Sequence, residues 1–269
     1  RILRFKGVEI SEEEENAVYI ALLLHDIGHG PFSHALENSI VNGVTHECIS
    51  LKFMEALNEE FKGKLDLAIT IFKGKYPRKF LNQLISSQLD MDRLDYLKRD
   101  SFYTGVSEGN INSERLITML NVKNDDLVVE EKGIYSVEKF IVARRLMYWQ
   151  VYLHKTGLGA EKLLEKVLLR AKELVLKGAK LPASNAFNYF LTNQINEENF
   201  NSETLRIFAK LDEENFAYSI EQEDFNDIIC SGILVPWVCQ YEFYDRDLDW
   251  DGEQDPDFLL KVSFDEPLQ

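Results

Sequence analysis

The sequence predicts an all-α fold with a minor β-hairpin and a less regular α+β C-terminal part. Apolar residues recur at spacings of three and four through most of residues 11–177, which is the period of a helix. The chain of 269 residues is 45% hydrophobic and 12% aromatic, so it can bury a sizeable core. Patterns typical of β-strands occur only in two short stretches. These observations together favour a helical globular protein.

The first long helix begins at a capping box, in which Ser11 is followed three residues later by Glu14. Residues 17–24 are apolar on nearly every face of the predicted helix, which indicates burial, and Gly28 and Gly30 end it. The same apolar spacing predicts further helical stretches at about residues 31–40, 46–60, 64–73, 77–99, 136–155 and 159–177.

The remaining segments are less regular. Residues 127–135 hold two short apolar pieces around a Lys-Gly turn, which predicts a small hairpin. Residues 180–235 predict shorter helices joined by loops, and the aromatic stretch 236–247 is compatible with a strand. We therefore expect one domain at residues 1–178 and a C-terminal helical or mixed extension at residues 179–269.

Charge and cysteine content indicate which classes of partner and which cellular compartment to expect. The chain has 46 acidic and 30 basic residues, a formal charge of −16, which disfavours binding to the phosphate backbone of nucleic acids. Three scattered cysteines provide no disulfide framework and favour a reducing cytoplasm. No apolar run approaches the roughly 18 residues that a membrane span needs. We expect a cytoplasmic protein without a membrane partner.

Four of the five histidines fall within 22 residues, and the first is followed directly by an aspartate, Asp26. They are His25, His29, His34 and His46. Imidazole and carboxylate are common ligands of divalent metals, and imidazole titrates near neutral pH. Any one of these histidines alone is more simply read as a helix cap or a buried polar residue. The cluster predicts a metal site with an acid–base group beside it.

A second group of polar residues is predicted on one helix face. Asp92, Tyr96 and Asp100 follow one another at four-residue steps, with Arg93 beside them. A solvated helix with ion pairs is the alternative. Against it, Asp92 would complete the mixed nitrogen and oxygen ligand set begun by the His-Asp pair.

Four-residue steps also place Arg144, Tyr148 and Tyr152 on one face of a later helix. An exposed arginine beside a core aromatic stripe would give the same pattern. The spacing alone leaves both interpretations open.

Residues 25–34, 46–47, 88–96 and 99–100 together resemble the HD-domain deoxynucleoside triphosphate triphosphohydrolases, which include the dGTPase-like enzymes. The resemblance covers about residues 10–160. It implies an HD-domain helical fold and metal-dependent cleavage of a deoxynucleoside triphosphate to deoxynucleoside and triphosphate. It further implies a homo-oligomer and allows a nucleotide effector.

The resemblance also implies roles for individual residues. A divalent ion, which can be Mg, Mn, Zn, Fe or Ni, would be held by His25, Asp26 and Asp92. His34 corresponds to the histidine that transfers a proton or attacks the phosphate, and Glu37 would orient it. The catalytic set implied is His34, Glu37, His46 and His29, of which the last two line the phosphate pocket.

Substrate binding is implied for residues of the two polar faces. Arg93 and Arg144 match basic residues near the phosphates, whereas Tyr96, Asp100 and Tyr152 match residues that contact the deoxyribose.

One feature departs from the family pattern. The family's first metal-ligand histidine precedes the His-Asp pair by more than the 24 residues present here, none of which is histidine. We therefore expect the HD domain to be N-terminally incomplete. Two alternatives stay open: another HD-type nucleotidase or phosphodiesterase, sharing the metal motif but not the sugar-binding face, and a catalytically silent HD module that binds a nucleotide or a partner.

Overall fold

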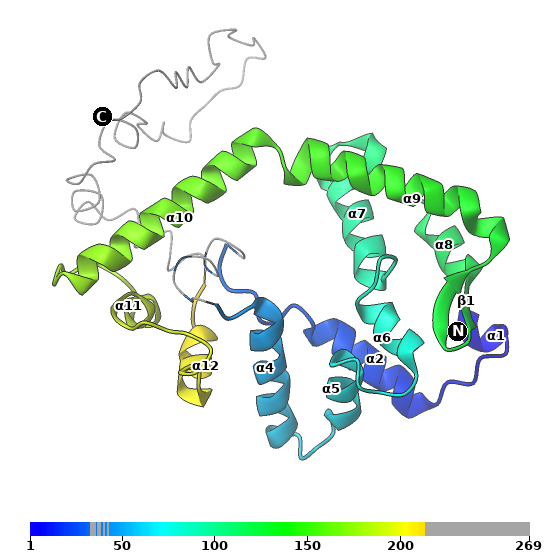
Figure 1. Ribbon diagram of the computed structural model, residues 1–269, viewed down its shortest axis with the longest axis horizontal. Helices are drawn as coiled ribbons and strands as arrows, with labels where there is room; N and C mark the ends of the chain where they lie inside the picture. The colour runs from blue at the N-terminus through cyan, green and yellow to red at the C-terminus, as the bar shows by residue number, and fades with distance from the viewer. Residues whose placement is uncertain (33–35, 37–38, 40, 42, 213–269) are drawn as a thin grey trace, which may run out of the picture. The chain divides into compact units, whose positions relative to one another are not determined.

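The computed structural model describes residues 1–32, 36, 39, 41 and 43–212. Over this range the chain folds into helices with one two-stranded antiparallel sheet, which confirms the predicted fold class (Figure 1). The strand predicted at 236–247 and most of the helix predicted at 31–40 lie outside the described residues. No helix within the described ranges has the length and apolar character needed to cross a membrane.

The elements, in chain order, are α1 (Ile2–Phe5), α2 (Glu12–Leu24), α4 (His46–Glu60), α5 (Asp66–Phe72), α6 (Lys79–Ile85), α7 (Met91–Thr104), the 3₁₀ turn η1 (Ser107–Gly109), α8 (Ser113–Met119), β1 (Leu120–Lys123), β2 (Asp126–Val129), the 3₁₀ turn η2 (Glu131–Gly133), α9 (Ile134–Met147), the π-helical turn η3 (Tyr148–Tyr152), α10 (Lys155–Leu176), α11 (Asn185–Thr192) and α12 (Ser202–Phe208).

Helix α2 begins at the predicted capping box. The Glu14 N–H donates to Ser11 Oγ at 3.1 Å, and the Ser11 N–H donates to Glu14 Oε2 at 2.9 Å. Ala17, Val18 and Ala21 are buried against α5 and α6, but Tyr19 and Leu23 are 60% and 80% exposed, so burial of the apolar run on nearly every face is wrong and α2 buries one face only. Its last turn delivers the His-Asp pair to the site described below.

The single helix predicted at residues 77–99 is wrong, because the structure has two helices there, α6 and α7. Ser86 is extended, and the side chain of the buried Asp90 accepts a hydrogen bond from the Arg93 N–H at 2.7 Å. An aspartate in this position is a strong N-cap, so it starts a new helix rather than continuing the old one.

The hairpin exists, but it lies earlier in the chain than predicted. Strands β1 and β2 are joined by Asn124 and Asp125, both with positive φ, as the tight turn of a two-residue hairpin requires. The Lys-Gly pair instead forms the turn η2 that leads into α9. Asn and Asp tolerate a backbone with positive φ. The Asn-Asp pair therefore forms the turn of the hairpin, rather than the Lys-Gly pair between the two apolar pieces.

Three main clusters of buried side chains hold the described residues together. One packs α2, α5 and α6 around residues such as Ile71 and Phe80. A second joins α7, α8 and α9 around Leu97. The third joins α4, α10, α11 and α12 around Phe187 and Phe190. The site residues come from the end of α2 and the turn after it, from α4 and α7, and from the α9–η3 junction.

Candidate functional site

His25 stands at the C-terminal end of α2 with its two ring nitrogens in different surroundings. Its Nδ1 lies 2.7 Å from the Leu22 carbonyl oxygen and donates to it. Its Nε2 is buried, has no hydrogen-bond partner among the described residues, and faces Asp26 Oδ2 at 3.4 Å and Asp92 Oδ1 at 3.7 Å. A histidine fixed at Nδ1 by a carbonyl presents Nε2 as a ligand atom.

The two carboxylates make this position strongly negative. The contact with Asp92 is the main reason why the pKa of His25 rises to about 9, against the opposing effect of burial. The same contact lowers the pKa of Asp92. The three side chains offer ligand atoms within 4.8 Å of one another, and this nitrogen and oxygen set suits a borderline divalent metal. The residues present therefore fit a cation at this position.

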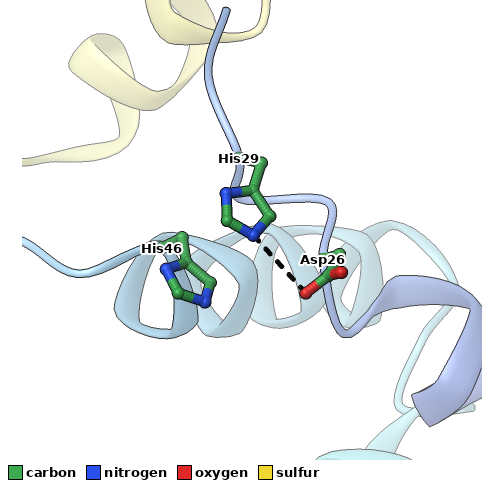
Figure 2. Close-up of side chains that lie close together, drawn as sticks. All are labelled: Asp26, His29 and His46. Carbon is green, nitrogen blue, oxygen red and sulfur yellow. Dashed lines mark ion pairs between the residues drawn. The ribbon is translucent and has the colours of Figure 1, made fainter. Parts of the chain in front are cut away.

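Asp26 also belongs to a second group, with His29 and His46 (Figure 2). Its Oδ1 lies 3.7 Å from His29 Nε2, while its other oxygen faces His25. The rings of His29 and His46 stack with centroids 4.0 Å apart and an interplanar angle of 16°. One carboxylate thus connects two groups of imidazoles.

A glycine allows the stack of His29 and His46 to form. A Cβ on Gly28 would lie 2.2 Å from the His46 carbonyl oxygen and 2.3 Å from the Ser50 amide nitrogen. The Gly28 N–H donates to Ser50 Oγ at 2.9 Å, which ties the turn after α2 to α4. Sequence reasoning used Gly28 only as a helix stop and missed Ser50. A glycine between the two histidines His25 and His29 was the available signal for such a close approach.

The second polar face is also assembled across two helices. The Tyr152 hydroxyl donates to Asp100 Oδ2 at 2.6 Å, and the rings of Tyr96 and Tyr152 meet edge-on at 6.0 Å. Burial, and then the Asp100 carboxylate, raise the pKa of Tyr152. The phenol therefore stays protonated and donates at every physiological pH.

Two arginines lie beside this tyrosine cluster. Arg93 donates from Nε to the Ser87 carbonyl oxygen at 2.8 Å, which holds its stem along α7. Arg144 Nη1 donates to Gln88 Oε1 at 3.0 Å, and its guanidinium lies 5.7 Å from the ring centroid of Tyr148. The two cations thus come from α7 and α9.

The π-helical turn η3 begins and ends at a tyrosine and brings the two rings together. Tyr148 and Tyr152 contact each other edge-on at 5.1 Å. The expected helix at 136–155 ends at Met147, where the backbone widens to i to i+5 hydrogen bonds such as Leu153 N–H to Tyr148 O. Single π-helical turns are frequent at functional sites.

Helix α7 links the two groups. Asp92 and Asp100 stand eight residues apart on it, about 12 Å at 1.5 Å per residue. His34 and Glu37 lie outside the described residues, so their predicted roles stay predictions.

Comparison with known proteins gives two adjoining family matches. Residues 2–100 match the HD domain, and residues 111–210 match the HD associated region.

Among individual proteins, the Bacillus subtilis protein YwfO is 35% identical over 271 residues, which are 97% of this chain and 60% of that protein. The Dictyostelium discoideum homologue of SAMHD1, named a deoxynucleoside triphosphate triphosphohydrolase, is 30% identical over 62% of this chain and 36% of its own length. A crystal structure named as a phosphohydrolase from Bacteroides thetaiotaomicron is 58% identical, with a TM-score of 0.80, over 82% of this chain and 55% of that chain. This chain thus spans only part of each of these relatives.

Proposed function

Since the chain contains an HD domain at residues 2–100 followed by an HD associated region at residues 111–210, we propose that it is a metal-dependent phosphohydrolase. Its proposed substrates are deoxynucleoside triphosphates, cleaved to deoxynucleoside and triphosphate. The observation that carries the proposal is that α7 contributes to two different groups. Asp92 belongs to a histidine and carboxylate group that could hold a metal, and Asp100 belongs to a tyrosine and carboxylate group that could contact a sugar. The Dictyostelium relative, named a deoxynucleoside triphosphate triphosphohydrolase, and the Bacteroides relative, named a phosphohydrolase, support the same class of reaction.

The metal-binding residues in this proposal are His25, Asp26 and Asp92. A divalent ion held there would supply Lewis acidity to a water molecule and would neutralise charge on the phosphate. The Leu22 carbonyl accepts from Nδ1, so Nε2 faces the two carboxylates, and a divalent ion held there would replace the Nε2 proton that the raised pKa of His25 retains at neutral pH.

We propose that imidazoles and arginines bind the phosphates. His29 and His46 form a stack beside Asp26, and Arg93 and Arg144 lie near the tyrosine cluster. We propose that His34, oriented by Glu37, transfers a proton to the leaving group or attacks the phosphate.

The deoxyribose would lie against the tyrosine cluster. Asp100 accepts the proton of the Tyr152 hydroxyl, so the phenol is fixed in one orientation. The edge-on rings of Tyr96 and Tyr152 form a rigid apolar surface beside hydrogen-bonding groups. Such a surface suits the mixed apolar and hydroxyl faces of a sugar.

The direct test is to incubate the protein with each deoxynucleoside triphosphate and Mg²⁺ or Mn²⁺, and to separate the products by anion-exchange chromatography. Deoxynucleoside with intact triphosphate is the expected result. Mono- or diphosphate products would instead indicate another HD-type nucleotidase. No product with any metal would indicate a nucleotide- or partner-binding module.

Two variants separate the proposed roles. Asp92→Ala removes a carboxylate that faces His25 Nε2, so we expect loss of both bound metal and turnover, measured by elemental analysis and product release. The matched control is Asp95→Ala on the same helix, because Asp95 is exposed and pairs only with Arg99 among the described residues. His34→Ala is expected to lose turnover and keep nucleotide binding.

A homo-oligomer, a nucleotide effector and a cytoplasmic location stay predictions for this chain.

A further inference from the structure

The linker between α6 and α7 contacts both arginines that are proposed to bind the phosphates. The Ser87 carbonyl oxygen accepts a hydrogen bond from Arg93 Nε at 2.8 Å. The side chain of the next residue, Gln88, accepts one from Arg144 Nη1 at 3.0 Å. The two acceptors are adjacent in the chain, whereas the two arginines belong to different helices, α7 and α9. One short segment therefore contributes to the position of both cations.

The buried carboxylate of Asp90 fixes the backbone of this linker. Asp90 Oδ2 accepts the Ser87 N–H at 3.0 Å, and Asp90 Oδ1 accepts the Arg93 N–H at 2.7 Å. The same Oδ2 lies 3.1 Å from Arg93 Nε, and the Asp90 side chain is only 4% exposed. Hydrogen bonds to a charged acceptor are the strong ones, so the segment around Gln88 is held rigidly.

Arg144 differs from Arg93 in that its partners are neutral. No carboxylate among the described residues forms an ion pair with Arg144. Its guanidinium instead contacts the amide oxygen of Gln88 and lies 5.7 Å from the ring centroid of Tyr148. An amide oxygen and an aromatic face both orient a guanidinium without cancelling its charge. Arg144 therefore keeps its full positive charge for an anionic ligand.

We propose that Gln88 is a positioning residue, which orients the Arg144 guanidinium for the phosphates of the nucleotide and, because it is neutral, leaves the charge of Arg144 available to them. The resemblance implied no separate role for Gln88. This proposal rests on the part of the proposed function that concerns triphosphate binding, and it does not depend on the cleavage step.

Binding of inorganic tripolyphosphate with Mg²⁺ to the 269-residue chain tests the proposal, because it requires no turnover. Isothermal titration calorimetry measures Kd. Gln88→Leu removes the acceptor of Arg144, so we expect Kd to rise about fivefold, as for the loss of one hydrogen bond. Gln88→Glu keeps a contact with Arg144 but adds a negative charge, so we expect Kd to rise about tenfold or more. The effect of Gln88→Glu is expected to shrink at high salt.

The order of these two variants separates positioning for an anion from a structural role. A carboxylate binds a guanidinium more strongly than an amide does, so a residue that only joined the linker to α9 would be replaced by glutamate without loss. Tripolyphosphate binding by Gln88→Glu as tight as in the unchanged chain would overturn the proposal.

The effect of Gln88 must also depend on Arg144. In an Arg144→Ala background, Gln88→Leu is expected to cause no further rise in Kd, because residues that act through one contact are not additive. A second fivefold rise in that background would overturn the proposal, since Gln88 would then act by another route.

The matched control is Gln150→Glu, which makes the same change of charge at an exposed residue of η3 and is expected to leave Kd unchanged. Circular dichroism checks that every variant is folded. An unchanged chain that binds no tripolyphosphate would overturn the proposal. The expected order of Kd values, together with no product from any deoxynucleoside triphosphate, would support the role of Gln88 and contradict the proposed reaction.

Discussion

Single side chains determine the chemistry at both ends of α7. Asp26 directs one carboxylate oxygen toward His25 and the other toward His29, so a single residue connects the two imidazole groups. Tyr152 has a comparable role at the other end, because its hydroxyl joins α7 to the α9–η3 segment through Asp100. The contacts of Asp26 lie within three residues of it, whereas Tyr152 meets a partner 52 residues away in the sequence.

Removing the Tyr152 hydroxyl tests this second contact. Tyr152→Phe keeps the ring against Tyr96 but leaves Asp100 without its donor, so we expect KM for the deoxynucleoside triphosphate to rise about fivefold, the equivalent of roughly 1 kcal/mol for one hydrogen bond. Steady-state kinetics measure the change. The control is Tyr103→Phe, since Tyr103 is 80% exposed on α7. Unchanged KM in Tyr152→Phe, or loss of metal, would contradict the assigned position beside the sugar.

At the scale of elements, close packing brings the histidine groups together. The turn after α2 lies against the N-terminal part of α4 with no space for a side chain at position 28. The hydroxyl of Ser50, itself fully buried, accepts the Gly28 N–H. Helix α4 therefore sets the position of His46 relative to His29.

Substitutions at this contact are expected to act on stability and on metal content together. Ser50→Ala leaves a buried N–H without its acceptor, so we expect a loss of about 1–3 kcal/mol in the free energy of unfolding, measured in urea. Gly28→Ala forces the turn away from α4, and we expect reduced bound metal by elemental analysis.

The control for the glycine substitution is Gly157→Ala in α10, where an added Cβ meets nothing within 4 Å. Alanine is a better helix former than glycine, so this variant is expected to be neutral or stabilised by up to about 1 kcal/mol. Equal metal content in Gly28→Ala and Gly157→Ala would show that the close approach at position 28 is not needed to form the site.

At the scale of the whole described fold, one buried carboxylate connects α2 to the segment before α6. Glu14 accepts two hydrogen bonds from Arg78 Nη1, both at 2.8 Å, and one from the Tyr76 hydroxyl at 3.0 Å. Burial alone would raise the pKa of Glu14, but the hydrogen bonds from the Ser11 N–H, Arg78 and Tyr76 outweigh burial and lower it. The folded structure therefore stabilises the charged carboxylate of Glu14.

The lowered pKa of Glu14 predicts how stability depends on pH. Its contribution is fully present above the carboxyl pKa of the unfolded chain, about 4.3, and is lost as pH falls through the lower pKa of the folded state. Glu14→Gln should therefore reduce the unfolding free energy by about 1–3 kcal/mol at pH 7 and flatten its decline below pH 4.3. Thermal unfolding at several pH values measures both effects.

The control for this effect is Glu12→Gln, an exposed residue of the same first turn, for which we expect a change within about 0.5 kcal/mol at pH 7. A Glu14→Gln variant as stable as the unchanged chain at pH 7 would exclude a structural role for the contact with Arg78.

Features that depend on neighbours a few residues away could be predicted from the sequence. The capping box at Ser11, the adjacency of His25 and Asp26, and the shared face of Asp92, Tyr96 and Asp100 follow from helix geometry, which is local. For the same reason the helical fold class was predictable, although the break before Asp90 was hidden by apolar spacing that continued across it.

Which of these local features contact one another depends on the packing of the helices in three dimensions. The contact of Tyr152 with Asp100 joins residues 52 positions apart, and the stack of His29 on His46 requires α4 to approach Gly28. The widened turn η3 was also not predicted, because a π-helical turn of five residues is too short to change the apolar period of the whole segment. Such contacts depend on how whole helices pack, and packing is set by many distant side chains at once rather than by any one segment.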